Sequence, residues 1–93
     1  QTTATPVVGL LTDSDAGVRA AAATVVGGMG HVAAAAQLET MVVSDADPVA
    51  RRNAAWALGK LGQQSSRVAL AKASTDGSGL VRMVARASLA SLK

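Results

Sequence analysis

The sequence predicts an all-α fold: a short α-solenoid, or right-handed superhelix, of three helical hairpins with about six helices. Three observations support this prediction. The chain repeats itself at intervals of 32 and then 31 residues, its apolar residues follow helical spacing, and its composition suits closely packed helices. Self-similarity at a period of this length is typical of proteins whose repeats stack on their neighbours.

Composition excludes several classes of protein. Hydrophobic residues make up 49% of the chain, with Ala at 21 positions, one Trp, and no Phe or Tyr. Ala and Leu favour helices, whereas strands are enriched in aromatic and β-branched residues. Because the chain has no Cys, it can form neither a disulfide nor a thiolate metal site. No apolar run approaches the roughly 20 residues that span a bilayer, so we expect no membrane span.

Each repeat carries the same set of residues in the same register. A turn Asp is followed by Arg after six residues, by Ala after nine, and by Val or Leu after thirteen. The sets are Asp13, Arg19, Ala22 and Val26; Asp45, Arg51, Ala54 and Leu58; Asp76, Arg82, Ala85 and Leu89. These matches predict a single domain over 1–93, with units of roughly 1–30, 31–62 and 63–93, and we expect it to be a segment of a larger protein.

The second helix of each unit has start and stop signals. Residues that can cap an N-terminus by accepting backbone N–H groups stand before each one: Asp15, Asp47 and Ser78. Pro48 suits a first helical position. Gly30 and Gly62 stand where a helix end favours a left-handed residue, and the run Gly27–Gly30 is interpreted as a helix C-terminal break. One helical face of the central unit is apolar: Ala50, Ala54, Ala57, Leu58 and Leu61.

Another helix is expected before each of these. The candidates are Pro6–Leu11, His31–Val43 and Ser65–Ser74. In the middle candidate an apolar stripe recurs at helical spacing: Ala34, Leu38, Met41 and Val42.

The segment Asp45–Gly62 resembles a known repeat family. Its pattern D-x-D-P-x-(V/A)-R-x-x-A-A-x-A-L-G-x-L-G is similar to HEAT-like repeats of the phycobilisome-lyase type, and the likeness extends over essentially the whole chain. The third unit departs from it where Ala90 and Lys93 replace two glycines. The resemblance implies an α-solenoid whose second helices line a concave face, but such folds serve many unrelated functions.

The repeated Asp and Arg residues form what we call the Asp–Arg ladder: Asp13, Arg19, Asp45, Arg51, Asp76 and Arg82. One interpretation is a basic strip that binds phosphate. The other is a structural device in which an Asp of one turn and an Arg of a neighbouring helix link adjacent repeats. Because every unit carries the pair, the structural interpretation is favoured.

Catalytic and metal-binding patterns are absent from the sequence. The Asp pairs at 13/15 and 45/47 are not followed by the further oxygen ligands of a calcium loop. His31 is the only histidine, and one His without Cys is a poor ligand set. Oxygenases with this repeat use His-Glu pairs, but Val32 follows His31 here. We therefore predict no enzymatic activity, no metal and no cofactor.

A candidate binding surface surrounds the single Trp. Its predicted residues lie on one face of the second helix of the central unit, with one residue from the third unit: Arg52, Asn53, Trp56, Lys60 and Met83. A Trp beside Arg and Met has the composition of a protein-binding hot spot. Alternatively, the indole fills a gap between Ala-rich helices beneath the Arg and Lys side chains.

The sequence therefore predicts a non-catalytic scaffold that binds another protein, one with an acidic patch, through the concave face. Two alternatives stay open. The resemblance to bilin-lyase subunits implies a chaperone or enzyme subunit that holds a tetrapyrrole, although no Cys, Tyr or Phe could line its pocket. HEAT-like modules can also bind nucleic acid, which a net charge of only +3 and a single aromatic residue disfavour.

Overall fold

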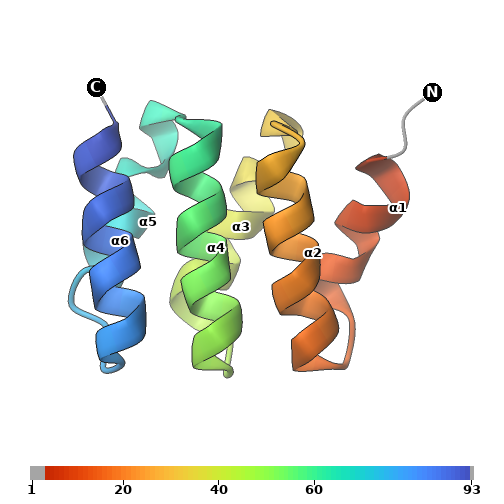
Figure 1. Ribbon diagram of the computed structural model, residues 1–93, viewed down its shortest axis with the longest axis horizontal. Helices are drawn as coiled ribbons and strands as arrows, with labels where there is room; N and C mark the ends of the chain where they lie inside the picture. Colours follow the sequence, from red (N-terminus) through yellow and green to blue (C-terminus); the bar gives the residue numbers. More distant parts are fainter. Residues whose placement is uncertain (1–3, 93) are drawn as a thin grey trace.

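Two layers of helices make up the structure (Figure 1). The computed structural model describes residues 4–92, and in this range it contains six α-helices and no strand. Helices α2, α4 and α6 lie side by side in one layer, α3 and α5 lie behind them, and α1 flanks α2. The elements are α1 (Ala4–Gly9), η1 (Leu10–Thr12), α2 (Ala16–Gly28), η2 (Val32–Ala34), α3 (Ala35–Ser44), α4 (Pro48–Leu61), η3 (Gln64–Ser66), α5 (Arg67–Ala73) and α6 (Gly79–Ser91), where η marks a 3₁₀ turn. The predicted all-α solenoid of three hairpins is confirmed.

The second helices start at the predicted residues. The Asp15 carboxylate accepts the Gly17 N–H at 2.7 Å, and the Asp47 carboxylate accepts the Ala50 N–H at 3.0 Å. These bonds satisfy donors that have no partner within the helix. Ser78 occupies the same position before α6, but its side chain makes no capping hydrogen bond. Ser78 therefore stands at the predicted N-cap position, but the predicted side-chain hydrogen bond is absent.

Two glycines end helical segments in the left-handed region. Gly30 has φ 68° and Gly62 has φ 67°, where a side chain would cause strain. The run Gly27–Gly30 lies at the C-terminus of α2, as predicted, and within it Gly27 and Gly28 are still helical. Only the residue that reverses the chain needs a positive φ, so the glycines before it remain helical.

The first helix of unit one lies at Ala4–Gly9, two residues before the predicted Pro6–Leu11, and the other two first helices are shorter than predicted. The segment from His31 begins with a 3₁₀ turn, and regular α-helix starts only at Ala35. The segment from Ser65 likewise becomes α-helical only at Arg67 and ends at Ala73. Tight 3₁₀ turns are common at helix ends, and hydrophobic spacing alone does not reveal them.

The core lies between the two layers. Both predicted apolar stripes are buried, and the larger side chains with no exposed surface come from both layers: Val26, Leu38, Val42, Leu58, Leu70 and Val81. Burying each Leu or Val stabilises the fold by about 1.5–3 kcal/mol before the cost of ordering the chain. Adjacent hairpins thereby share one continuous core.

Glycine allows neighbouring second helices to approach closely. A Cβ added at Gly27 of α2 would lie 2.7 Å from the Ala57 Cα of α4. The equivalent Gly59 of α4 faces α6 in the same way, and its added Cβ would lie 2.8 Å from the Ser88 Cβ. Each contact is too close for any side chain on the glycine.

Candidate functional site

The Asp–Arg ladder connects each repeat to the next. The Arg19 guanidinium on α2 donates to both carboxylate oxygens of Asp45, with Nε–Oδ2 at 2.8 Å and Nη2–Oδ1 at 2.9 Å. Its Nη1 donates to the Asp13 carbonyl oxygen at 2.8 Å. The arginine thus binds the turn of its own repeat and the carboxylate of the following one. Such a bidentate pair of a guanidinium and a carboxylate is stronger and more directional than a single charged hydrogen bond.

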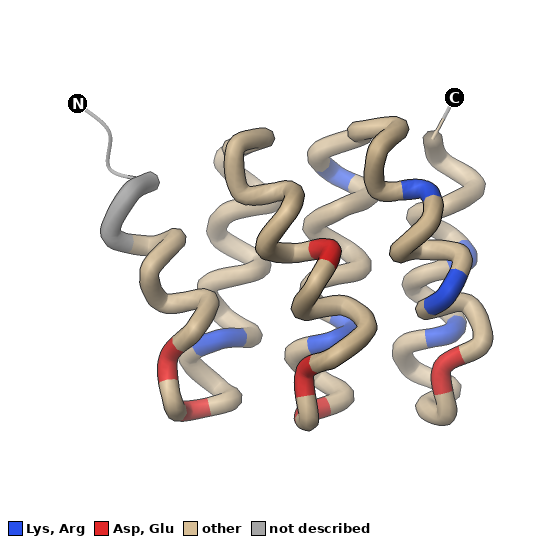
Figure 2. The backbone as a smooth tube through the Cα atoms, turned by 180° about the vertical axis from the view of Figure 1, so that it is seen from behind, with Lys and Arg blue, Asp and Glu red and all other residues tan. Residues whose placement is uncertain are grey.

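The second bridge repeats this geometry. Arg51 Nε lies 2.9 Å from Asp76 Oδ2, and its Nη2 lies 3.1 Å from Oδ1. Arg51 Nη1 donates to the Asp45 carbonyl oxygen at 2.8 Å. In Figure 2, acidic and basic positions follow one edge of the molecule across all three hairpins. In the described residues these arginines therefore act as inter-repeat links and have little capacity left for a phosphate.

The bridges shift the pKa values of their carboxylates. Hydrogen bonds from Arg19 hold the pKa of Asp45 below the ordinary 3.8, although burial opposes the shift. Arg51 lowers the pKa of Asp76 in the same way. Both carboxylates are mostly buried, with side-chain exposures of 7% for Asp45 and 11% for Asp76.

A pH dependence of stability follows from these shifts. A carboxylate whose pKa is lower in the folded state stabilises the fold above its unfolded pKa, and this contribution is lost as the pH falls through the folded value. We expect the melting temperature to fall once the pH drops below about 4. A variant with Asp45→Asn and Asp76→Asn should melt lower at pH 7 and lose less on acidification. Equal acid losses in the two proteins, measured by circular dichroism, would contradict this.

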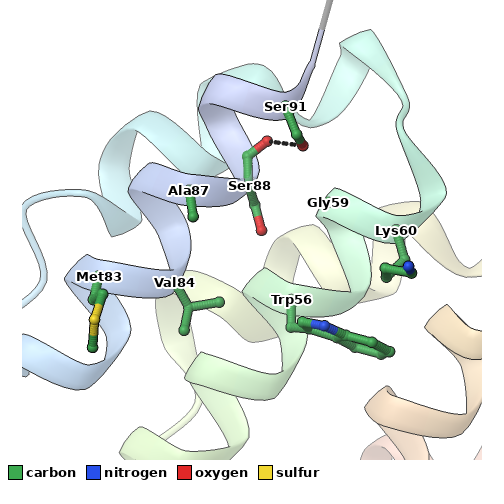
Figure 3. A pocket seen from close by; sticks show the side chains of 8 residues that line it. All are labelled: Trp56, Gly59, Lys60, Met83, Val84, Ala87, Ser88 and Ser91. Carbon is green, nitrogen blue, oxygen red and sulfur yellow. Dashed lines mark hydrogen bonds between the residues drawn. The ribbon is translucent and has the colours of Figure 1, made fainter.

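A groove lies between α4 and α6 on the second-helix face, the surface made by α2, α4 and α6. Its volume is about 460 Å³. The lining combines small residues with larger ones at the rim: Trp56, Gly59, Lys60, Met83, Val84, Ala87, Ser88 and Ser91. Figure 3 shows Met83, Val84 and Ala87 along the α6 side. Volumes of this size are typical of sites for small molecules or clusters of partner side chains.

Trp56 both packs and remains exposed. In Figure 3 its ring extends away from α6, and its Cζ3 lies 3.2 Å from where a Cβ would stand on Gly27 of α2. The residue nevertheless keeps 38% of its surface exposed. The Lys60 ammonium lies 5.8 Å from the ring centroid, a distance at which a cation is attracted to the aromatic face. The indole therefore packs beside α2 and Lys60 and stays partly exposed, and its role as a binding hot spot stays a prediction.

The other predicted surface residues differ in their environment. Asn53 Nδ2 donates to the Ala20 carbonyl oxygen of α2 at 3.1 Å, and Arg52 Nε donates to Asn53 Oδ1 at 3.0 Å. The Asn53 side chain therefore also links two repeats. Met83 is 64% exposed at the rim of the groove.

Sequence reasoning missed the floor of the groove. Gly59 and Ser88 pack against each other there, and Val84 and Ser91 complete the lining. The signal was the repetition of glycine at 27 and 59, in the same register of two units.

Other kinds of site find no support in residues 4–92. No three His, Cys, Asp or Glu side chains there come together as a metal-ligand set. No helix among them is long and apolar enough to cross a bilayer.

A second groove of about 320 Å³ lies between α3 and α5, where Glu39, Val43, Val68 and Lys72 contribute to the lining. The Glu39 carboxylate accepts the Ser66 hydroxyl at 2.8 Å, so it serves a local packing role.

Comparison with known proteins agrees with this architecture. A family model described as HEAT repeats matches residues 4–90. The matched range includes both ladder bridges and most of the groove lining. A search of curated proteins finds no match.

Proposed function

Since the chain belongs to the family of HEAT repeats, which generally mediate protein–protein interactions, we propose that it is a non-catalytic scaffold whose second-helix face binds another protein. The observation that supports this most is the groove beside the exposed Trp56. The narrower resemblance to phycobilisome-lyase repeats stays a prediction.

The charges of the second helices indicate the chemistry of the partner. None of α2, α4 and α6 contains an Asp or Glu, although all three contain Arg. Arg19 and Arg51 form ion pairs with the carboxylates of the ladder. The other basic residues of these helices form no ion pair with a carboxylate in residues 4–92: Arg52, Lys60, Arg82 and Arg86. A surface that combines apolar and positively charged groups is complementary to an acidic, partly apolar segment.

The binding geometry that we propose centres on the indole. A partner helix or loop would place an apolar side chain over Ala87 and Val84 and cover the exposed edge of Trp56. Its acidic groups would then lie near Lys60 and Arg52. Large aromatic residues surrounded by contacts that exclude water account for much of the affinity in many interfaces.

A site-specific crosslink tests the location of this surface. A photo-reactive residue at Ala87, in the groove, should capture the partner from an extract of the source cells. The same residue at exposed Ala71 on α5, in the other layer, should not. Duplex DNA provides a second arm, because salt-dependent DNA binding without protein capture would replace this proposal by the nucleic-acid alternative.

Truncating Trp56 should lower the affinity for the captured partner. We expect Trp56→Ala to reduce affinity at least about fivefold, because a hot-spot side chain contributes more than about 1 kcal/mol. Val68→Ala, which truncates a 69% exposed side chain on α5, should leave affinity unchanged. Titration calorimetry gives both constants, and circular dichroism confirms that the variants remain folded.

The natural fluorescence of the chain supplies an independent measurement. Trp56 is the only Trp, so its emission should be quenched by acrylamide in the free chain and protected in the complex. A blue-shifted emission that resists quenching in the free chain would contradict the proposal, as would equal affinities of Trp56→Ala and Val68→Ala.

A further inference from the structure

The interface between α2 and α4 carries an aromatic ring beside its closest approach. Gly27 of α2 packs against Ala57 of α4, and Trp56 Cζ3 lies 3.2 Å from where a Cβ would stand on Gly27. The Lys60 ammonium lies 5.8 Å from the centroid of the same ring. An indole of the chain itself therefore packs over the contact between these two helices.

The interface between α4 and α6 repeats this contact without the ring. Gly59 of α4 packs against Ser88 of α6, in the register of the contact just described. In the register of Trp56, the third unit has Ala87, whose side chain is a single methyl group. Gly59, Ala87 and Ser88 all line the groove of about 460 Å³. The groove therefore corresponds to the place that an indole occupies in the preceding interface.

A hydroxyl in the lining of this groove has no partner. Ser88 is only 7% exposed, and within residues 4–92 its hydroxyl makes no hydrogen bond. Its backbone carbonyl is the group that accepts the Ser91 hydroxyl, at 2.7 Å. Figure 3 shows the Ser88 hydroxyl pointing from α6 into the space beside Gly59. Because largely buried polar groups are stabilised by a hydrogen-bond partner, a ligand with a donor suits this position.

We propose that the groove between α4 and α6 receives an indole side chain of the protein partner, an inference that rests on the proposed function. The ring would lie across Gly59 as Trp56 lies across Gly27. Its N–H would donate to the Ser88 hydroxyl oxygen, which supplies the partner that a buried indole needs. Acidic residues beside it in the partner would face Lys60, which forms no ion pair within residues 4–92.

Titration of the isotope-labelled chain with N-acetyltryptophanamide, followed by NMR, tests the preference of the groove. We expect shifts centred on the amides of Gly59 and Ser88, and binding at least about fivefold tighter than that of N-acetylleucinamide. Methylation of the indole nitrogen should weaken binding about threefold, because the hydrogen bond is lost. Ser88→Ala should bind the methylated and unmethylated probes equally.

A ring supplied by the chain itself should compete with the probe. Ala87 is exposed, so Ala87→Trp should fold and place its indole over Gly59, as Trp56 lies over Gly27. We expect this variant to bind N-acetyltryptophanamide at least about tenfold more weakly. Ala71→Trp, at an exposed position on α5, is the matched control and should bind the probe as the original chain does.

The outcomes distinguish this inference from the proposed function. Equal affinities for the tryptophan and leucine probes would overturn the inference, as would shifts centred on Val43 and Val68 of the other groove. Tighter binding of adenosine monophosphate would overturn it in favour of a nucleobase. If the tryptophan probe binds as expected but the crosslinker at Ala87 captures no protein, the proposed function fails while the preference of the groove for an indole stands.

Discussion

Replacing Gly27 with alanine should destabilise the chain by about 3 kcal/mol, near the upper end of the usual cost of overpacking a core. The added methyl group would lie 2.7 Å from the Ala57 Cα and 2.8 Å from its Cβ. Neither atom can move without shifting α4. The methyl group would also meet the Trp56 ring at 3.2 Å. We therefore expect the substitution to separate α2 from α4 and to lower the melting temperature by more than 10 °C.

The adjacent glycine is the control. Gly28 lies in the same helix, and a Cβ added there meets nothing within 4 Å. Gly28→Ala should be neutral or stabilise the chain by up to about 1 kcal/mol, because alanine is the better helix former. Thermal unfolding followed by circular dichroism compares the two. Equal stabilities of Gly27→Ala and Gly28→Ala would show that the second helices have room to spare.

Removing Arg51 should destabilise the chain by about 2–3 kcal/mol, as expected for charged hydrogen bonds lost from a partly buried pair. The arginine side chain is 17% exposed and the Asp76 side chain 11%. Arg51→Ala would leave this carboxylate without its partner in a region that water reaches poorly, which costs more than the loss of a surface ion pair. Urea denaturation at pH 7 measures the change.

A comparison with Arg82, the third ladder arginine, distinguishes the contributions of the two kinds of hydrogen bond that Arg51 makes. Arg82 donates to the carbonyl oxygen of its own turn but bridges to no carboxylate in residues 4–92. Arg82→Ala should therefore cost about 1 kcal/mol or less, measured by the same urea denaturation. If Arg82→Ala and Arg51→Ala destabilise the chain equally, the bridge to the next repeat contributes nothing.

Much of the fold could be predicted because the same sequence pattern occurs in each of the three units. Asp47 and Pro48 mark the start of α4, Gly62 marks its end, and the same register predicts the neighbouring helices. The ladder geometry was accessible for the same reason, since an Asp and an Arg present in every unit suggest a link between units. The direction of each bridge could not be predicted, because sequence spacing does not say whether Arg19 binds the carboxylate of Asp13 or that of Asp45.

The candidate site was harder to predict from the sequence, because it depends on distances between helices. Trp56, Lys60 and Met83 were found because large or charged residues stand out among alanines. The floor at Gly59 and Ser88 was missed, since small residues give no such signal and their closeness appears only when α4 and α6 are packed together. The hydrogen bond from Asn53 to α2 was missed for the same reason.

The paired glycines also determine shape. A stack whose units approach more closely in one layer than in the other must bend toward the closer layer, as a row of wedges does. Gly27 and Gly59 let the second helices approach one another closely, and these helices contact one another more extensively than α3 and α5 do in the layer behind. On this argument the curvature of the second-helix face depends on the absence of two methyl groups, one at Gly27 and one at Gly59. A substitution at either glycine should then change the fit of the proposed partner even where the chain remains folded.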